Sequence, residues 1–226
     1  MRMIATDLDN TLLRNDKSLS DYTMQVLRQC QAQGIKVVAA TGRGIHGAEE
    51  VITPLDFDAL ITNNGALTFL DGELLFEHTL PLELSRAILC ELEGQPAVSD
   101  IHVNSASDNI HSVRIWFETQ DHDYAADFTR RYPQLHIKLF SNEDIYDIGP
   151  TTKAQAIENL AAHWGIAMRD IVAFGDDFND VDMLQHCGTG VAVANTIDQA
   201  RAAANFICAS NEDDGVARWI GEHIFT

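Results

Sequence analysis

The chain has 226 residues, of which 46% are hydrophobic and 22% charged, as in an ordinary globular protein. This length allows one large core, or a core of about 150 residues with a small second domain. The formal net charge of −19 disfavours nucleic acid and anionic membrane surfaces as partners, because both are bound through lysine and arginine. A small phosphorylated substrate is still compatible, since a metal ion and a few cations reverse the field inside one cleft.

Targeting and redox features predict a cytoplasmic protein. Strand-like sequence begins at Met3, which argues against a signal peptide, and no apolar stretch is long enough to span a bilayer. The four cysteines are scattered without metal-ligand spacing, and we expect each to be a small core residue. They are Cys30, Cys90, Cys187 and Cys208. No apolar stripe marks an interface, so both a monomer and a small homo-oligomer are compatible with the sequence.

The first predicted strand is the apolar run from Met3 to Leu8, which leads into Asp7-Leu8-Asp9-Asn10-Thr11. Side chains alternate along a strand, so the carboxylates of Asp7 and Asp9 point the same way. Such a pair at the end of a buried strand is costly unless a cation binds or the two share a proton. By themselves, Asp9, Asn10 and Thr11 are also ordinary turn formers.

A helix and two more strands follow. Ser20 can cap a helix that runs to about Gln33. The near-continuous apolar runs Ile35–Ala40 and Ala59–Ile61 predict strands that are covered on both faces, as in a parallel sheet. The polar segments that end these two strands are Thr41-Gly42-Arg43 and Asn63-Asn64-Gly65.

Residues 80–149 show a different pattern. Helices are predicted at Pro81–Gly94 and Asp123–Tyr132, and apolar and polar residues alternate in Val113–Phe117 and His136–Leu139. Alternation is typical of antiparallel strands with one open face. We therefore predict an α+β cap inserted into the core, and expect it to act as a lid and specificity domain.

The rest of the chain returns to the first pattern. A helix is predicted from Lys153 to Trp164, and the apolar runs Ile171–Phe174 and Val191–Val193 predict two more parallel strands. The first of these runs ends in Gly175-Asp176-Asp177-Phe178-Asn179-Asp180. The sequence thus predicts an α/β, doubly wound, Rossmann-like catalytic core that is formed by residues 1–79 and 150–226 and interrupted by the cap.

The candidate site lies at one edge of this sheet, because ligands of open parallel sheets bind beyond the carboxyl ends of the strands. Carboxylates there are the hard oxygen ligands that Mg²⁺ prefers, and hydroxyl and cationic groups suit a phosphate. A nucleophilic carboxylate, a metal and such donors together serve phosphoryl transfer. The expected metal ligands are Asp7, Asp9, Asp176 and Asp180, and the expected phosphate-binding residues are Thr41, Gly42, Arg43, Lys153 and Asn179.

Each element also has a purely structural interpretation. Thr41 and Gly42 could form a plain turn, and Lys153 could be a solvated lysine in the first turn of a helix. The segment from Gly175 to Asp180 could be a loop followed by a helix cap at Asn179 or Asp180, although three acids in five residues repel one another without a cation.

The four segments in this order resemble the motifs of the haloacid dehalogenase superfamily of phosphotransferases. DLDNTLL from Asp7 resembles the first motif, AATGR ending at Arg43 the second, Lys153 the third, and GDDFND from Gly175 the fourth. NNGA, GVAVAN and DGVARWI extend the resemblance to the Cof-type branch, subfamily IIB, with its α/β cap. Asn10 and Ala154 stand where relatives often carry glycine.

The resemblance implies a role for each residue. Asp7 would attack phosphorus and form an aspartyl-phosphate, and Asp9 would protonate the leaving oxygen and later activate water. Asp7 and Asp176 would bind Mg²⁺ directly, with the main-chain carbonyl of Asp9, and Asp180 would bind it directly or through water. Thr41 and Lys153 would hold the phosphoryl group, assisted by Asn179.

These features predict a Mg²⁺-dependent phosphatase of a small phosphorylated metabolite, such as a sugar phosphate or phosphoglycolate. A phosphomutase of the same superfamily is one alternative. A phosphorylatable signalling receiver is another, but Asp9 and the inserted cap count against it, because an acid/base beside the nucleophile shortens the life of the phosphorylated form.

Overall fold

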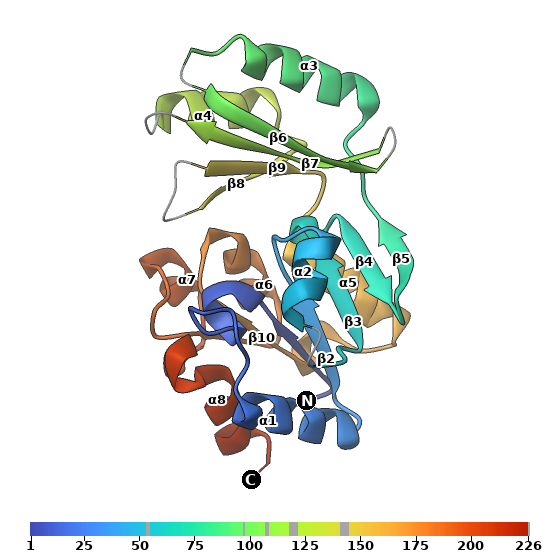
Figure 1. The fold of residues 1–226 in the computed structure, drawn as a ribbon, viewed down its shortest axis with the longest axis vertical. Helices are drawn as coiled ribbons and strands as arrows, with labels where there is room; N and C mark the ends of the chain where they lie inside the picture. Colours follow the sequence, from blue (N-terminus) through green and yellow to red (C-terminus); the bar gives the residue numbers. More distant parts are fainter. Residues whose placement is uncertain (53–54, 97, 107–108, 118–121, 141–144, 226) are drawn as a thin grey trace.

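A computed structural model describes residues 1–52, 55–96, 98–106, 109–117, 122–140 and 145–225. Its larger sheet has the strand order β12-β11-β10-β1-β2-β3-β4-β5 (Figure 1). The first six strands in this order are parallel, and β4 and β5 extend the sheet as an antiparallel hairpin. The strands are β1 (Met3–Thr6), β2 (Lys36–Ala40), β3 (Ala59–Thr62), β4 (Leu67–Leu70), β5 (Glu73–Glu77), β10 (Ile171–Gly175), β11 (Thr189–Ala192) and β12 (Phe206–Ile207).

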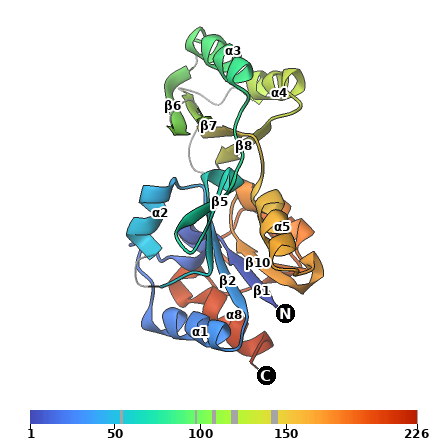
Figure 2. The same cartoon turned by 90° about the vertical axis from the view of Figure 1, so that its right-hand side faces the viewer.

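Helices cover both faces of this sheet, which explains why its central strands are apolar throughout. In β1, Ile4 packs in a core with α1, α2 and α8, whereas Met3 and Ala5 pack on the opposite side with α5 and α6. Figure 2 shows α1 and α2 on one side of the sheet and α5 on the other. The helices of the core are α1 (Asp21–Ala32), α2 (Ile45–Ile52), α5 (Lys153–His163), α6 (Val181–His186), α7 (Asp198–Ala203) and α8 (Gly215–His223).

The cap is an antiparallel sheet with two helices on one face. Its strand order is β6-β7-β9-β8, and α3 and α4 lie on the face away from the core (Figure 1). Apolar residues such as Ile88, Val113 and Ile148 pack between the helices and the sheet. The elements are α3 (Leu82–Glu93), β6 (Val98–Ala106), β7 (Asn109–Phe117), α4 (His122–Arg131), β8 (His136–Phe140) and β9 (Ile145–Gly149).

The fold class predicted from the sequence, a doubly wound α/β core with an inserted α+β cap, is confirmed. The expected helix starts are present as well: Ser20 Oγ accepts a hydrogen bond from the amide of Thr23, and Thr152 Oγ1 accepts one from Gln155. The β4–β5 hairpin was not predicted from the sequence.

The cysteine prediction is wrong in part. Cys30 and Cys187 are buried, but Cys90 is exposed and Cys208 is half-buried. Cys90 lies on α3 of the cap, where a helix buries only one stripe of its surface. In the described part of the chain, no helix has the length and apolar character needed to cross a membrane.

Candidate active site

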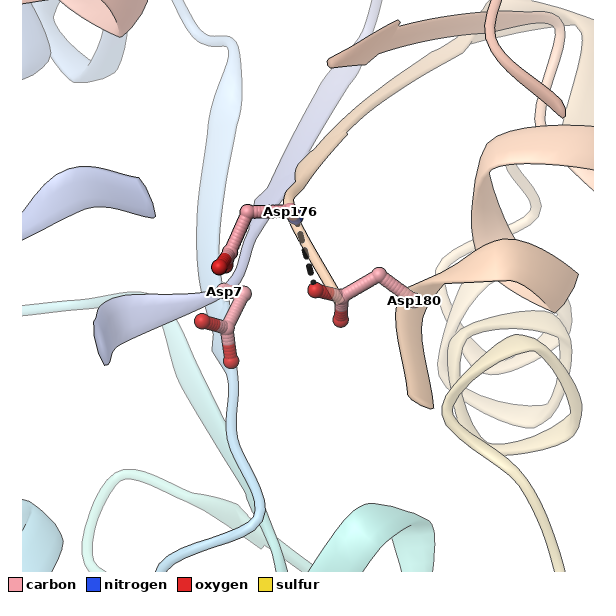
Figure 3. Close-up of side chains that lie close together, drawn as sticks. All are labelled: Asp7, Asp176 and Asp180. Carbon is pink, nitrogen blue, oxygen red and sulfur yellow. Dashed lines mark hydrogen bonds between the residues drawn. The ribbon is translucent and has the colours of Figure 1, made fainter. Parts of the chain in front are cut away.

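Three carboxylates meet where β1 and β10 end. The two strands pair in parallel with Thr6 opposite Phe174, so Asp7 and Asp176 leave neighbouring strands at the same edge. Asp180 comes from the short 3₁₀ turn Phe178–Asp180. One carboxylate oxygen of each of the three lies within 4.8 Å of the others, and Figure 3 shows the side chains converging.

The loop after β10 is built to hold Asp180 in this position. Asp180 Oδ2 accepts a hydrogen bond from the amide of Asp176 at 3.0 Å (Figure 3). It also accepts one from the amide of Asp177 at 3.2 Å. A Cβ atom at Gly175 would lie 2.4 Å from the Cβ of Asp180, so only glycine allows this close approach. Asp177 caps the turn that follows. The cap is thus Asp177, whereas the structural alternative expected Asn179 or Asp180, and Asp180 makes no side-chain cap bond to the helix that follows. Asp180 instead joins the acid cluster.

Lys153 is the cation at the centre of the acid cluster. It is the first residue of α5 and is fully buried, with Nζ 2.6 Å from Oδ1 of Asp7 and 2.6 Å from Oδ1 of Asp180. Burial disfavours its charge, but the carboxylates of Asp180 and Asp7 outweigh burial and raise the pKa of Lys153. The alternative of a solvated lysine is thus wrong.

Burial also shifts the acids. It raises the pKa of Asp7 to about 7, against the attraction of Lys153 and with a further contribution from Asp180. It raises the pKa of Asp176 to about 9, aided by the charges of Asp7 and Asp180 and opposed by a 2.6 Å hydrogen bond from Thr11 Oγ1. The neighbouring acids therefore destabilise one another's charged forms. This donor set fits a small divalent cation, whose charge would offset the repulsion.

Asp9 lies outside this cluster and pairs with two cations. Its carboxylate accepts a bidentate pair of hydrogen bonds from Arg43, at 2.6 and 2.7 Å, and lies 2.8 Å from Lys17 Nζ. Partial burial would raise its pKa, but the hydrogen bonds from Arg43 and Lys17 dominate and lower the pKa of Asp9 to about 2. The side chain is therefore charged, and its carboxylate is not part of the cluster formed by Asp7, Asp176 and Asp180, although Asp9 was among the expected metal ligands.

Asn10, which follows Asp9, adopts a left-handed conformation with φ 57°. Asparagine tolerates this region better than most residues. The structure thus explains why the departure from glycine at this position is compatible with the fold. Ala154 is likewise compatible, because it lies inside α5, where alanine is favourable.

A cavity of about 170 Å³ adjoins these groups. Among the predicted site residues, Lys153 and Asp180 do not line it, and both are fully buried. Thr41 Oγ1 accepts a hydrogen bond from the amide of Arg43 at 3.1 Å, as in the plain turn that was the structural alternative for this segment. The hydroxyl proton of Thr41 can still be donated to a ligand. The lining residues are Asp7, Asp9, Asn10, Thr41, Gly42, Arg43, Arg114, Asp176, Asp177 and Asn179.

A larger cavity, about 600 Å³, lies beside α2 and β3. Its lining includes Ile45, Phe57 and Phe69 and contains none of the clustered acids. The candidate site is therefore defined by its chemistry and by the strand ends, and not by volume.

Arg114, Asp147 and Asn64 form a network between the cap and the core that was not expected from the sequence. Arg114 of β7 donates from Nη2 to the carbonyl of Gly42, at 3.2 Å, and from Nε to Asp147 of β9, at 3.4 Å. The other Asp147 oxygen accepts from Asn64 Nδ2, at 2.8 Å, and Asn64 Oδ1 accepts from Asn179, at 2.9 Å. Asn64 was expected at this edge of the sheet, in the polar segment after the third strand, but no role was predicted for it. The sequence signal that could have indicated Arg114 and Asp147 was the presence of charged residues on the open face of the cap strands.

Comparison with known proteins agrees with this geometry. The sequence model of the haloacid dehalogenase-like hydrolase family matches residues 4–113 and 93–220. The chain therefore belongs to the family of haloacid dehalogenase-like hydrolases.

Two relatives illustrate the family. The HMP-PP phosphatase of Escherichia coli O157:H7 is 30% identical over 239 residues, which cover 89% of this chain and 87% of the relative. The 5-amino-6-(5-phospho-D-ribitylamino)uracil phosphatase YcsE of Bacillus subtilis is 27% identical over 236 residues, 97% of this chain and 94% of the relative. The relatives confirm the predicted enzyme class, a phosphatase, over the signalling receiver.

Solved structures share the whole fold. A haloacid dehalogenase-like hydrolase from B. subtilis has a TM-score of 0.86 at 22% identity and covers 99% of this chain and 100% of its own. The sugar phosphatase BT4131 of HAD subclass IIB has a TM-score of 0.85 at 21% identity, with 98% of both chains covered. The cap, as well as the core, is thus part of a known architecture.

Proposed function

We propose that the protein is a Mg²⁺-dependent phosphatase that hydrolyses a small phosphorylated metabolite through an aspartyl-phosphate on Asp7. The observation that carries this proposal is the position of Asp7 on the cavity wall, beside a second acid that pairs with an arginine and in contact with a buried lysine. A carboxylate, an acid/base and a fixed cation are the parts that phosphoryl transfer requires.

Asp7 would act as the nucleophile. Lys153 holds one of its oxygens and thereby orients the carboxylate. Attack on phosphorus forms the Asp7–phosphorus bond and breaks the bond to the leaving oxygen, and water then releases phosphate. Mg²⁺, held by Asp7 and Asp176 and by Asp180 directly or through water, would supply charge for the phosphoryl oxygens. Thr41, the amide of Gly42 and Asn179 would donate hydrogen bonds to the same group.

Asp9 would be the general acid and base. It lines the cavity two residues after Asp7, so it is placed to give a proton to the leaving oxygen and later to take one from water. Arg43 and Lys17 hold Asp9 charged when no substrate is bound. The charged state is the one required for activating water. To act as an acid, Asp9 must first take up a proton, and for this the substrate must compete with Asp9 for Arg43 and Lys17.

The cap, residues 80–149, would act as a lid. Arg114 brings it into contact with the main chain of Gly42, next to the proposed phosphate-binding residues. Such a lid would exclude water that competes for the phosphoryl group. Its residues would also contact the leaving group and so select among substrates. The relatives named above act on small phosphorylated compounds, which supports the same class of substrate for this protein.

The proposed function predicts turnover of p-nitrophenyl phosphate and of members of a panel of phosphorylated metabolites when Mg²⁺ is present. We expect multiple turnovers, measured as released phosphate per enzyme. A single stoichiometric burst would contradict hydrolysis. Activity that needs a bisphosphate activator and yields an isomeric phosphate would indicate the phosphomutase instead.

Asp9→Asn should act differently on different leaving groups. For an alkyl phosphate we expect kcat/KM to fall by about 10²–10⁴, because a poor alkoxide needs protonation. The loss on p-nitrophenyl phosphate should be smaller, since its phenolate leaves without a proton. Lys17→Met removes one contact of Asp9 but keeps the acid, and so serves as the control. Equal losses on both substrates would argue against the acid role.

A further inference from the structure

The short 3₁₀ turn after β3, Asn63–Gly65, lies against the loop that carries the proposed phosphate-binding residues. The main-chain amide of Asn63 donates to the carbonyl of Arg43 at 2.9 Å, and that of Asn64 donates to the carbonyl of Thr41 at 3.1 Å. Asn64 has φ 55°, a left-handed conformation that asparagine tolerates better than most residues. Its side chain is buried and does not line the cavity. Asn64 can therefore act on the site only through its neighbours.

The side-chain amide of Asn64 joins the cap to the active site. Its Nδ2 donates at 2.8 Å to Asp147, a cap residue with 2% of its side chain exposed. Its Oδ1 accepts at 2.9 Å from Nδ2 of Asn179, which lines the cavity. A Cβ atom at Gly42 would lie 3.1 Å from the same Oδ1, so the amide also packs against the phosphate-binding loop. One buried side chain thus contacts the cap, this loop and a residue of the cavity wall.

Asp147 determines which way this amide points. A carboxylate offers only acceptors, so it must face Nδ2 of Asn64, and Oδ1 is then turned toward Asn179. Rotation of the amide by 180° would place Oδ1 against the carboxylate and an N–H group against the N–H group of Asn179. The other oxygen of Asp147 accepts from Arg114 Nε, which fixes the carboxylate in turn. The orientation of a buried core residue therefore depends on a residue of the cap.

We propose that Asn64 is a positioning residue that makes the orientation of Asn179 depend on closure of the cap. In the closed arrangement Asp147 orients Asn64, and Asn64 holds the amide of Asn179 at the cavity wall for the phosphoryl group. Opening of the cap removes the Asp147 contact, and Asn179 is then no longer held in one orientation. Phosphoryl transfer is thereby limited to the state in which the cap excludes water. This inference rests on the proposed phosphatase function.

An exchange of donor and acceptor tests the contact between Asn64 and Asp147. In Asn64→Asp two carboxylates face each other without a donor. In Asp147→Asn no orientation of the new amide accepts from both Arg114 and Asn64. The double variant restores every bond, because the amide at position 147 accepts from Arg114 and donates to the carboxylate at position 64. That carboxylate can still accept from Asn179.

Each single variant should lower kcat by about 10- to 100-fold, as expected for the loss of a hydrogen bond to a charged group. The double variant should return to within about threefold of the wild type. The losses on p-nitrophenyl phosphate and on an alkyl phosphate should be equal, since Asn179 serves the phosphoryl group that both share. Both substitutions keep the shape of the side chain, and aspartate also tolerates the left-handed conformation of Asn64, so we expect folded proteins. Circular dichroism checks this.

Asn109→Asp is the matched control. Asn109 of β7 is exposed and also donates to a carboxylate across the boundary between cap and core, that of Glu77, at 3.0 Å. It does not line the cavity. The same substitution at this position removes an equivalent contact between cap and core, so kcat should stay within about threefold of the wild type.

A second comparison tests the contact between Asn64 and Asn179. In an Asn179→Ala background, Asn64→Asp should lower kcat by less than about threefold, because the residue through which it acts is gone. If the full loss recurred, Asn64 would only hold the cap on the core, and the proposal would be wrong. If Asn64→Asp is unstable, Asp147→Asn in the same background makes the same comparison.

Two further results would overturn the proposal. One is a double variant that is no more active than the single variants, and the other is wild-type kcat in Asn64→Asp. Either result would leave the phosphatase function standing. Failure of the wild-type enzyme to cleave any phosphate ester would instead contradict the proposed function itself.

Discussion

Asp7→Asn should reduce phosphatase activity by roughly 10⁴- to 10⁶-fold, the range seen when a nucleophile is removed from an enzyme. The amide has the shape of the carboxylate but lacks the charge that attacks phosphorus. Burial opposes the charge of Asp7 in the folded protein, and Lys153 keeps Asp180 as a partner, so we expect the fold to survive. Steady-state turnover and circular dichroism measure the two effects.

A suitable control for this substitution is Asp71→Asn. Asp71 is exposed in the turn between β4 and β5 and has φ 52°, a conformation that asparagine also adopts, so the change alters charge without strain. Its activity should equal that of the wild type. If Asp7→Asn kept more than about a tenth of the activity, Asp7 would not be the nucleophile.

Removal of Mg²⁺ is the second large effect that we expect. Chelation by EDTA should abolish turnover, because Asp7, Asp176 and Asp180 then repel both one another and the dianionic substrate. Calcium should bind the same acids but support little turnover, since it accepts looser geometry and more ligands. Full activity in excess EDTA would contradict the metal assignment.

The same metal should stabilise the fold in a pH-dependent way. Burial raises the pKa of Asp7 to about 7 and that of Asp176 to about 9. Without metal, the stability from these acids is therefore present at low pH and decreases as the pH rises through these values. Mg²⁺ would bind the deprotonated carboxylates and offset that loss, so its effect on Tm should be larger at about pH 8.5 than at about pH 5.5.

At saturating Mg²⁺ the expected rise in Tm at the higher pH is roughly 5–10 °C, from the free energy of binding at about 100 times Kd. Asp176→Asn removes one of the proposed ligands and should reduce this rise, whereas Asp71→Asn should not. Differential scanning calorimetry with and without Mg²⁺ measures both. A rise of equal size at both pH values would argue against metal binding by acids with raised pKa.

Local sequence signals were sufficient for the main elements of the fold. The apolar runs before Asp7 and Asp176 predicted β1 and β10, because a strand covered on both faces needs apolar residues throughout. The Ser20 cap placed the start of α1 correctly. The β4–β5 hairpin was missed, although the Asp-Gly pair between its two strands is a local signal for a hairpin turn.

The site residues also differ in whether local sequence signals could predict them. Asp7, Asp176 and Asp180 could be predicted because they follow strand ends, and parallel strands bring such ends to one edge. The partners of Asp9 could not, because Lys17 and Arg43 reach it from a loop and from the end of another strand.

The sequence by itself thus determined the class of fold, the edge of the sheet where chemistry is expected and the acids that gather there, since each depends on spacing within one segment. Only the tertiary structure decided which cation faces which acid and that Arg114 reaches the cavity from the cap. These contacts join segments far apart in the chain, and their geometry depends on how the cap sheet packs over the core. No periodicity within a single element encodes that packing.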